Sequence, residues 1–262
     1  MSAFPVSVKG TLNFAADRSD GGSFSNFTGQ ADQKLLPVEV DIINARSLAH
    51  KPTLEEEGFA LVSHPAGEAA WSDKTWLNSV YVPSCLELVK RLTGATATLQ
   101  MYYPIVRRRV AGDDNAATAG FIHIDQPRDV YRPQAEEAAA ALGIKLQRGA
   151  IYNVWKAITP PPQDLPLAVA DRRTIDANDH VLGMSVEADN TTAYFALAHS
   201  PKAPTWYYFP DMTPEESLVF LAADFDPGRP LGCAHTAFSP PPIEGGYVPR
   251  ASVEVRVIAS FD

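Results

Sequence analysis

Residues 120–129 read GFIHIDQPRD, and within this stretch His123 and Asp125 are one residue apart in an apolar run. In a β-strand, residues i and i+2 point to the same face. The stretch therefore predicts an imidazole and a carboxylate side by side in the interior of a β fold. Two such groups are costly to bury unless a partner satisfies them. A metal ion is one such partner, and it needs a third ligand elsewhere in the chain.

The sequence around this stretch is dominated by short β-strand patterns, rich in β-branched and aromatic residues and bounded by turn signals. The 22 prolines also favour many short elements over long helices. We predict a mainly β fold with flanking helices, a double-sheet jelly roll. The expected strands lie at residues 6–14, 38–44, 58–64, 95–108, 120–125, 149–158, 167–175, 192–200, 205–210, 231–238 and 251–261.

Three segments carry helix signals. Residues 84–94 have apolar positions at helical spacing and end at a glycine, and residues 132–143 are rich in Ala and Glu. Residues 211–225 begin with a capping-box pattern, Thr213 followed by Glu216. A shorter helix is expected near residues 72–81. The polar stretches 17–33 and 111–120 predict exposed loops.

Composition limits the class of protein. The chain has 262 residues, 45% of them hydrophobic, a net charge of −9 and no basic stripe, so we expect a single domain over residues 1–262, with 1–34 partly loop, and no nucleic-acid partner. Two cysteines give neither a disulfide framework nor a cysteine-rich zinc site. No signal peptide and no apolar run of membrane-spanning length is visible, which predicts a cytoplasmic protein without a membrane partner.

The third ligand is sought among the remaining histidines. His199 and His235 both follow strand-like patterns, and His235 comes 110 residues after Asp125. Two histidines and one carboxylate form the facial triad of non-haem Fe(II) oxygenases, which leaves coordination positions open for a co-substrate and O₂.

The segment after His235 favours that residue as the third ligand. Arg250, Ser252, Glu254 and Arg256 alternate along one strand face, and Arg250 comes 15 residues after His235. A 2-oxoglutarate co-substrate would need a cation for its far carboxylate, and a guanidinium binds a carboxylate with two hydrogen bonds. Arg250 is the first choice for this role and Arg256 the second.

A resemblance to a known family agrees with this pattern. HID (123–125), NVWKAI (153–158), PPPQDLPLAVADRRTID (160–176), WYYFPDMTPEESLVFLAADFD (206–226), HTAFSPP (235–241) and PRASVEVR (249–256) resemble the oxygenase family that includes the cephamycin C-7 methoxylation protein J, the fungal gibberellin desaturase and certain fungal meroterpenoid oxygenases. The similarity runs through most of residues 35–258.

The resemblance implies a double-stranded β-helix (jelly roll), Fe(II), 2-oxoglutarate and a small natural-product substrate. By motif matching it places iron on His123, Asp125 and His235 and the co-substrate near Arg250, with Arg256 as the second candidate. Related enzymes hydroxylate, desaturate or cyclise their substrates, so the outcome of the reaction stays open.

Several further residues have both a functional and a structural interpretation. The hydroxyl of Tyr102 or Tyr103 is a candidate second contact for the co-substrate carboxylate. Trp155 is either a wall of the pocket or an ordinary core aromatic. For three other features the structural interpretation is favoured: a surface position for Lys156, exposure for the arginines at 107–109, and a buried thiol for Cys233.

Together these observations predict an Fe(II)/2-oxoglutarate-dependent dioxygenase. It would attack an unactivated C–H bond of a small metabolite and release succinate and CO₂; a homodimer is plausible. Two alternatives remain. One is a cupin-like metalloenzyme that does not use 2-oxoglutarate, and the other is a non-catalytic jelly-roll binding module.

Overall fold

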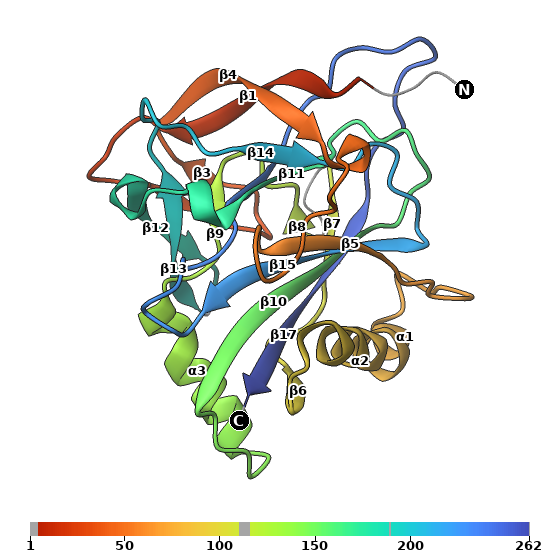
Figure 1. Ribbon diagram of the computed structural model, residues 1–262, viewed down its shortest axis with the longest axis vertical. Helices are drawn as coiled ribbons and strands as arrows, with labels where there is room; N and C mark the ends of the chain where they lie inside the picture. The colour runs from red at the N-terminus through yellow and green to blue at the C-terminus, as the bar shows by residue number, and fades with distance from the viewer. Residues whose placement is uncertain (1–4, 110–115, 189, 262) are drawn as a thin grey trace.

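Two large sheets form the body of the protein in a computed structural model, which describes residues 5–109, 116–188 and 190–261 (Figure 1). In spatial order, the first sheet contains β1 (Ser7–Ala15), β4 (Leu35–Asn44), β14 (Trp206–Tyr208), β11 (Leu167–Ala170), β16 (His235–Ala237), β9 (His123–Ile124), β13 (Thr191–Leu197), β12 (His180–Val186), β2 (Ser23–Phe24) and β3 (Ala31–Asp32). The second contains β5 (Phe59–Ser63), β15 (Glu216–Asp224), β10 (Arg148–Ala157), β17 (Ser252–Phe261), β7 (Ile105–Arg108) and β8 (Ala116–Ala117), and β6 (Ala97–Gln100) also pairs with β17.

Helices flank the second sheet. A continuous helical segment consists of α1 (Lys74–Trp76), a π-helical turn η2 (Leu77–Tyr81) and α2 (Val82–Thr93), and α3 (Arg128–Ala140) lies at the other side of the sheet (Figure 1). Three short 3₁₀ turns are η1 (Ala45–Ser47), η3 (Arg172–Thr174) and η4 (Ala177–Asp179). No helix in these described ranges is long and apolar enough to cross a membrane.

Strand β17 divides the interior into an apolar and a polar layer. Its residues Val253, Val255 and Val257 join Leu88 and Val89 of α2 in one hydrophobic cluster. Since side chains alternate along a strand, Ser252, Glu254 and Arg256 point the opposite way, toward the first sheet. A polar layer between two sheets is where a functional site can be built.

The predicted architecture is confirmed, because the protein is mainly β with flanking helices and its two sheets form a jelly roll. Each of the eleven expected strand segments contains a strand, although 95–108 is divided into β6 and β7. The strand β12 was not predicted. Within the expected loop 17–33, β2 and β3 extend the edge of the first sheet. Of the expected loop 111–120, residues 111–115 lie outside the described residues and 116–117 form β8.

The helix predictions have mixed outcomes. The helix at 84–94 is confirmed by α2, which ends at Gly94 in the left-handed conformation that favours glycine (φ 70°). The helix at 132–143 is confirmed, but α3 starts earlier, at Arg128, so that Pro133 lies inside it. The prediction for 211–225 is wrong, since residues 216–224 form the buried strand β15.

Candidate metal centre

His123 and His235 face each other across two neighbouring strands. Strands β9 and β16 are antiparallel, and these two residues are direct partners in the register. Directly opposite residues of an antiparallel pair project their side chains from the same face. The two imidazole rings therefore lie with their centroids 4.2 Å apart.

Asp125 completes the group immediately after β9. One ligand atom from each of His123, Asp125 and His235 lies within 4.8 Å of the other two, and all three residues are buried. The structure thus brings the three predicted ligands together. His199, the other contender, is exposed and stacks edge-on against Phe14 instead.

Backbone carbonyls orient both imidazoles. The Nδ1–H of His123 donates to the carbonyl of Phe121 at 3.1 Å, and the Nδ1–H of His235 donates to that of Cys233 at 3.2 Å. Each Nε2 then carries a lone pair, and such second contacts are typical of metal-binding histidines. Burial lowers the pKa of His123 to about 3 and also lowers that of His235, so both rings are in the neutral form that binds metals.

Two residues of the second sheet hold Asp125. Asn153 Nδ2 donates to one carboxylate oxygen and Arg256 Nη2 to the other, both at 2.6 Å. Asn153 and Arg256 are themselves direct partners on β10 and β17. Burial acts to raise the pKa of Asp125, but the charge of Arg256 holds that pKa well below its usual range. Each carboxylate oxygen has a second lone pair, so a ligand position remains for a metal ion.

A small cavity between the two sheets is lined by both histidines but not by Asp125. Its lining combines the imidazoles with charged and apolar side chains: Arg107, Ala119, His123, Trp155, Leu167, His235, Thr236, Ala237, Arg250 and Glu254. The guanidinium of Arg250 lies 5.3 Å from the ring centroid of Trp155. Its Nη2 donates to Thr118 Oγ1 at 3.2 Å, whereas its Nε and Nη1 are buried and have no hydrogen-bond partner within the described ranges. Burial, followed by the charge of Arg107, lowers the pKa of Arg250 to about 9.

Arg256, Tyr102 and Tyr103, the other candidates for co-substrate binding, are not in the lining of this cavity. Arg256 is turned toward Asp125, with its Cζ 5.8 Å from the ring centroid of Tyr102. The Tyr102 hydroxyl contacts Gln126 at 3.3 Å and also Gln134, and neither Tyr102 nor Arg256 lines the cavity. Tyr103 is 81% exposed.

Some structural expectations for charged residues are wrong. Lys156 is fully buried rather than at the surface, and its Nζ donates to three backbone carbonyls. Arg107 is buried, while Arg108 and Arg109 are exposed as expected. Glu254 is 4% exposed, and Cys233 is a buried free thiol as expected. Sequence reasoning also missed Asn153, although an amide in the middle of an apolar strand is the same kind of signal as His123.

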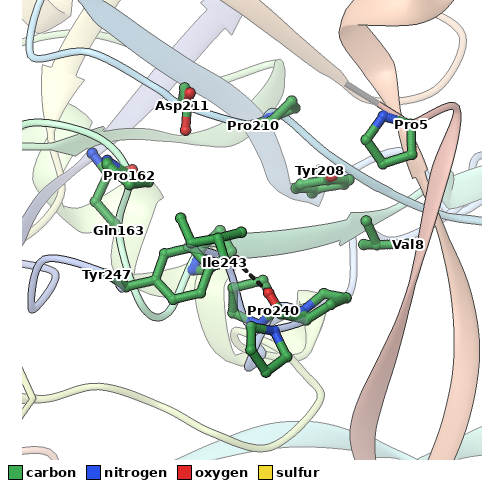
Figure 2. Close-up of a pocket in the computed structure, with 13 residues that line it drawn as sticks. Pro5, Val8, Pro162, Gln163, Tyr208, Pro210, Asp211, Pro240, Ile243 and Tyr247 are labelled. Atoms are coloured by element: carbon green, nitrogen blue, oxygen red, sulfur yellow. Dashed lines mark hydrogen bonds between the residues drawn. The ribbon is translucent and has the colours of Figure 1, made fainter. Parts of the chain in front are cut away.

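A second pocket lies elsewhere on the molecule and shares no lining residue with this cavity (Figure 2). Prolines from three loops, including Pro162, Pro210 and Pro240, surround it together with Tyr208 and Tyr247. None of the three residues of the candidate metal site, His123, Asp125 and His235, is in its lining.

A jelly roll with two imidazoles and one carboxylate converging between its sheets is typical of the 2-His-1-carboxylate class of metalloenzymes. The family model described as "Oxidoreductase/YMDC permease-like domain" matches residues 12–260, and the chain belongs to this family.

Named relatives agree with the resemblance noted in the sequence. Oxidoreductase R2 from a Phoma species is 28% identical over 98% of this chain and 97% of its own length. The alpha-ketoglutarate-dependent dioxygenase phiK from a fungal species is 28% identical over 97% of this chain and 96% of its own. The solved structure of the iron and alpha-ketoglutarate-dependent endoperoxidase NvfI superposes with a TM-score of 0.83 at 23% identity, over 98% of this chain and 99% of that one. The predicted family resemblance and the jelly-roll fold are thereby confirmed.

Proposed function

We propose that this protein is a non-haem Fe(II)/2-oxoglutarate-dependent dioxygenase that oxidises a C–H bond of a small metabolite with O₂. The observation that carries the proposal is the convergence of His123, Asp125 and His235 near Arg250. Arg250 lines the cavity beside the two histidines and has two buried nitrogens without a partner among the described residues. A cupin-like metalloenzyme without 2-oxoglutarate would leave that buried cation without a role. The names of relatives such as phiK support the same class.

The residues of this chain have separate tasks in the proposal. His123 Nε2, His235 Nε2 and one oxygen of Asp125 would hold the iron, and Arg250 would bind the far carboxylate of 2-oxoglutarate with a charge-assisted pair of hydrogen bonds. Arg256 and Asn153 position Asp125. The bound iron supplies activation of O₂, coupled to decarboxylation of the co-substrate to succinate and CO₂.

The indole of Trp155 and the apolar Leu167 line the cavity and would limit the entry of water. Keeping water out strengthens the electrostatic contacts made by Arg250. Whether the product is hydroxylated, desaturated or cyclised depends on which carbon the cavity presents to the metal. The homodimer and the cytoplasmic location stay predictions.

The test is binding of 2-oxoglutarate under anaerobic conditions to protein loaded with Fe(II), followed by succinate release on addition of O₂. We expect binding and slow uncoupled release in the wild type, and loss of both in His123→Ala. His199→Ala is the matched control, because this histidine is exposed and away from the cavity. Succinate release that needs neither iron nor His123 would contradict the proposal.

A further inference from the structure

A surface cleft lies beside the metal-site cavity and shares Arg107 with it. The cleft measures about 220 Å³. Its lining comes from residues 24–35, with Phe24 and Leu35, and from residues 117–121, with Phe121. The rings of Phe24 and Phe121 pack against each other, with their centroids 4.9 Å apart. Arg107 and Ala119 line both the cleft and the cavity. A molecule bound in the cleft therefore lies against the same Arg107 side chain that lines the cavity of the histidines.

Arg107 is held in place by one end of its guanidinium. Its Nη1 donates to Asn26 Oδ1 at 2.8 Å and to the carbonyl of Ala117 at 3.0 Å. Asn26 is fixed in turn by Glu187, which accepts from the Asn26 backbone N–H at 2.7 Å and from the Ser25 hydroxyl at 2.8 Å. Both hydrogen bonds that Arg107 makes to described residues come from Nη1, so its Nε and Nη2 are available to a ligand.

The charges around the cavity favour an anionic ligand. Two buried guanidinium groups, those of Arg107 and Arg250, and the partly buried one of Arg256 lie with two buried carboxylates, those of Asp125 and Glu254. Arg256 lies between the two carboxylates, with Nη2 at 2.6 Å from Asp125 and 3.2 Å from Glu254. Fe(II) and the 2-oxoglutarate dianion would add no net charge. Asp164 acts on Arg250 and Glu187 on Arg107 from a distance, but among the described residues neither carboxylate accepts a hydrogen bond from these guanidinium groups. Arg107 therefore has no directly bonded carboxylate, and a buried charge is costly unless it is paired.

We infer that Arg107 is a substrate-binding residue, and that the substrate is a small molecule with an apolar body and one anionic group, a carboxylate or its equivalent. The apolar body lies in the cleft against its apolar lining, which includes Leu35, Ala117 and Ala119, and the anionic group accepts hydrogen bonds from Arg107. Because Arg107 and His123 line the same cavity, this contact places the carbons next to the anion near the metal. The inference rests on the proposed function.

The test uses protein loaded with Mn(II) and 2-oxoglutarate, so that the co-substrate site is filled and no turnover occurs. Calorimetry compares three acid–amide pairs as probes: benzoate with benzamide, indole-3-acetate with indole-3-acetamide, and cyclohexanecarboxylate with its amide. We expect at least one acid to bind the wild type about tenfold more tightly than its amide, because one charge-assisted contact separates them. Absence of any acid preference in the wild type overturns the inference.

Three variants test whether Arg107 causes the preference for the acid over its amide. In Arg107→Met it should fall to within about threefold. Asn26→Asp keeps the side-chain volume but places a competing carboxylate on Arg107, so it should also abolish the preference even if Arg107→Met folds poorly. Arg108→Met is the matched control, since Arg108 is the exposed neighbour on the same strand and its loss should change nothing. An acid preference that survives in Arg107→Met and Asn26→Asp overturns the inference.

The 2-oxoglutarate affinity separates this inference from the proposed function. Arg107→Met should bind the co-substrate as the wild type does, whereas Arg250→Met should not. If Arg107→Met loses 2-oxoglutarate as strongly as Arg250→Met, Arg107 binds the co-substrate and the inference is wrong. If the wild type does not bind 2-oxoglutarate at all, the proposed function fails, and the same acid–amide comparison on the metal-free protein still reports on Arg107.

Discussion

Arg250 and Arg256 are six residues apart, yet their surroundings give them different tasks. Arg250 comes directly before β17 and has two buried nitrogens without a partner in the part of the chain that the structure describes. The Nη2 of Arg256 donates to Asp125, a candidate metal ligand. An arginine that donates to an oxygen of a metal ligand affects the metal affinity of the site. An arginine that lines a cavity and has unpaired nitrogens can instead bind an anionic ligand there.

This difference predicts two separable defects. Arg250→Met should weaken 2-oxoglutarate binding about 10- to 100-fold and leave metal affinity unchanged, because it removes a charge-assisted pair of hydrogen bonds. Arg256→Met should weaken metal binding about 10- to 100-fold, as loss of a contact to a ligand commonly does. Metal affinity measured by competition with a chelator and co-substrate affinity measured by calorimetry distinguish the two. A loss of co-substrate binding confined to Arg256→Met would reverse the assignment.

At the scale of elements, β15 shows that a capping contact predicted from the sequence can form although the helix predicted to follow it does not. The capping-box contact predicted at residues 213–216 exists, since the Thr213 backbone N–H donates to Glu216 Oε2 at 3.0 Å. It closes a turn rather than starting a helix. The residues that follow, Leu218 to Asp224, are all buried. In the second sheet, β15 lies between β5 and β10. A continuous apolar run suits a strand covered on both faces, and periodicity alone does not distinguish it from a buried helix.

Glu216 anchors the start of this strand. It accepts from Arg46 Nη1 and Nη2 at 2.8 and 2.7 Å, in addition to Thr213. Glu216→Gln should therefore lower the free energy of unfolding by about 1–2 kcal/mol, because a bidentate contact to a charged group is lost at a half-buried site. Chemical denaturation measures the change. Glu215→Gln, at the exposed neighbouring position, should change it by less than about 0.5 kcal/mol, and an equal effect in both variants would contradict the role of Glu216.

At the scale of the whole molecule, a buried histidine couples stability to pH. Ser84 Oγ donates to the carbonyl of Tyr81, so it accepts from His64 Nε2, and His64 Nδ1 accepts from the Ser217 hydroxyl. A protonated ring would lose the Ser217 contact. Burial, followed by the charge of Lys156, lowers the pKa of His64 to about 4 from an ordinary value of 6.5.

The sign of the pH dependence follows from that direction. Between pH 6.5 and about 4 the unfolded chain binds a proton at His64 that the folded chain does not, so stability falls as the pH is lowered through this window. Denaturation curves of metal-free protein between pH 7 and 5 should be less pH-dependent in His64→Gln, by up to about 1.4 kcal/mol per pH unit. His199→Gln, at an exposed histidine, is the control. An unchanged slope in His64→Gln would show that His64 does not titrate in this way.

The sequence by itself determined the fold class and the candidate metal ligands of this protein. Alternating and apolar runs indicate strands because side chains alternate at every second residue. His123 and Asp125 are conspicuous because a polar pair in an apolar run must have a partner. His235 is the third candidate ligand, and Arg250 follows it after 15 residues. Both were identified from the sequence alone.

Only the tertiary structure decided how those residues are supported and what surrounds them. The pairing of His123 with His235 and of Asn153 with Arg256 depends on strand register, and the contact of Arg256 with Asp125 joins two sheets. Burial of Arg107 and Lys156 depends on the elements that cover them. Local patterns record what one segment prefers, whereas these contacts join segments up to 131 residues apart, so their formation is a property of packing.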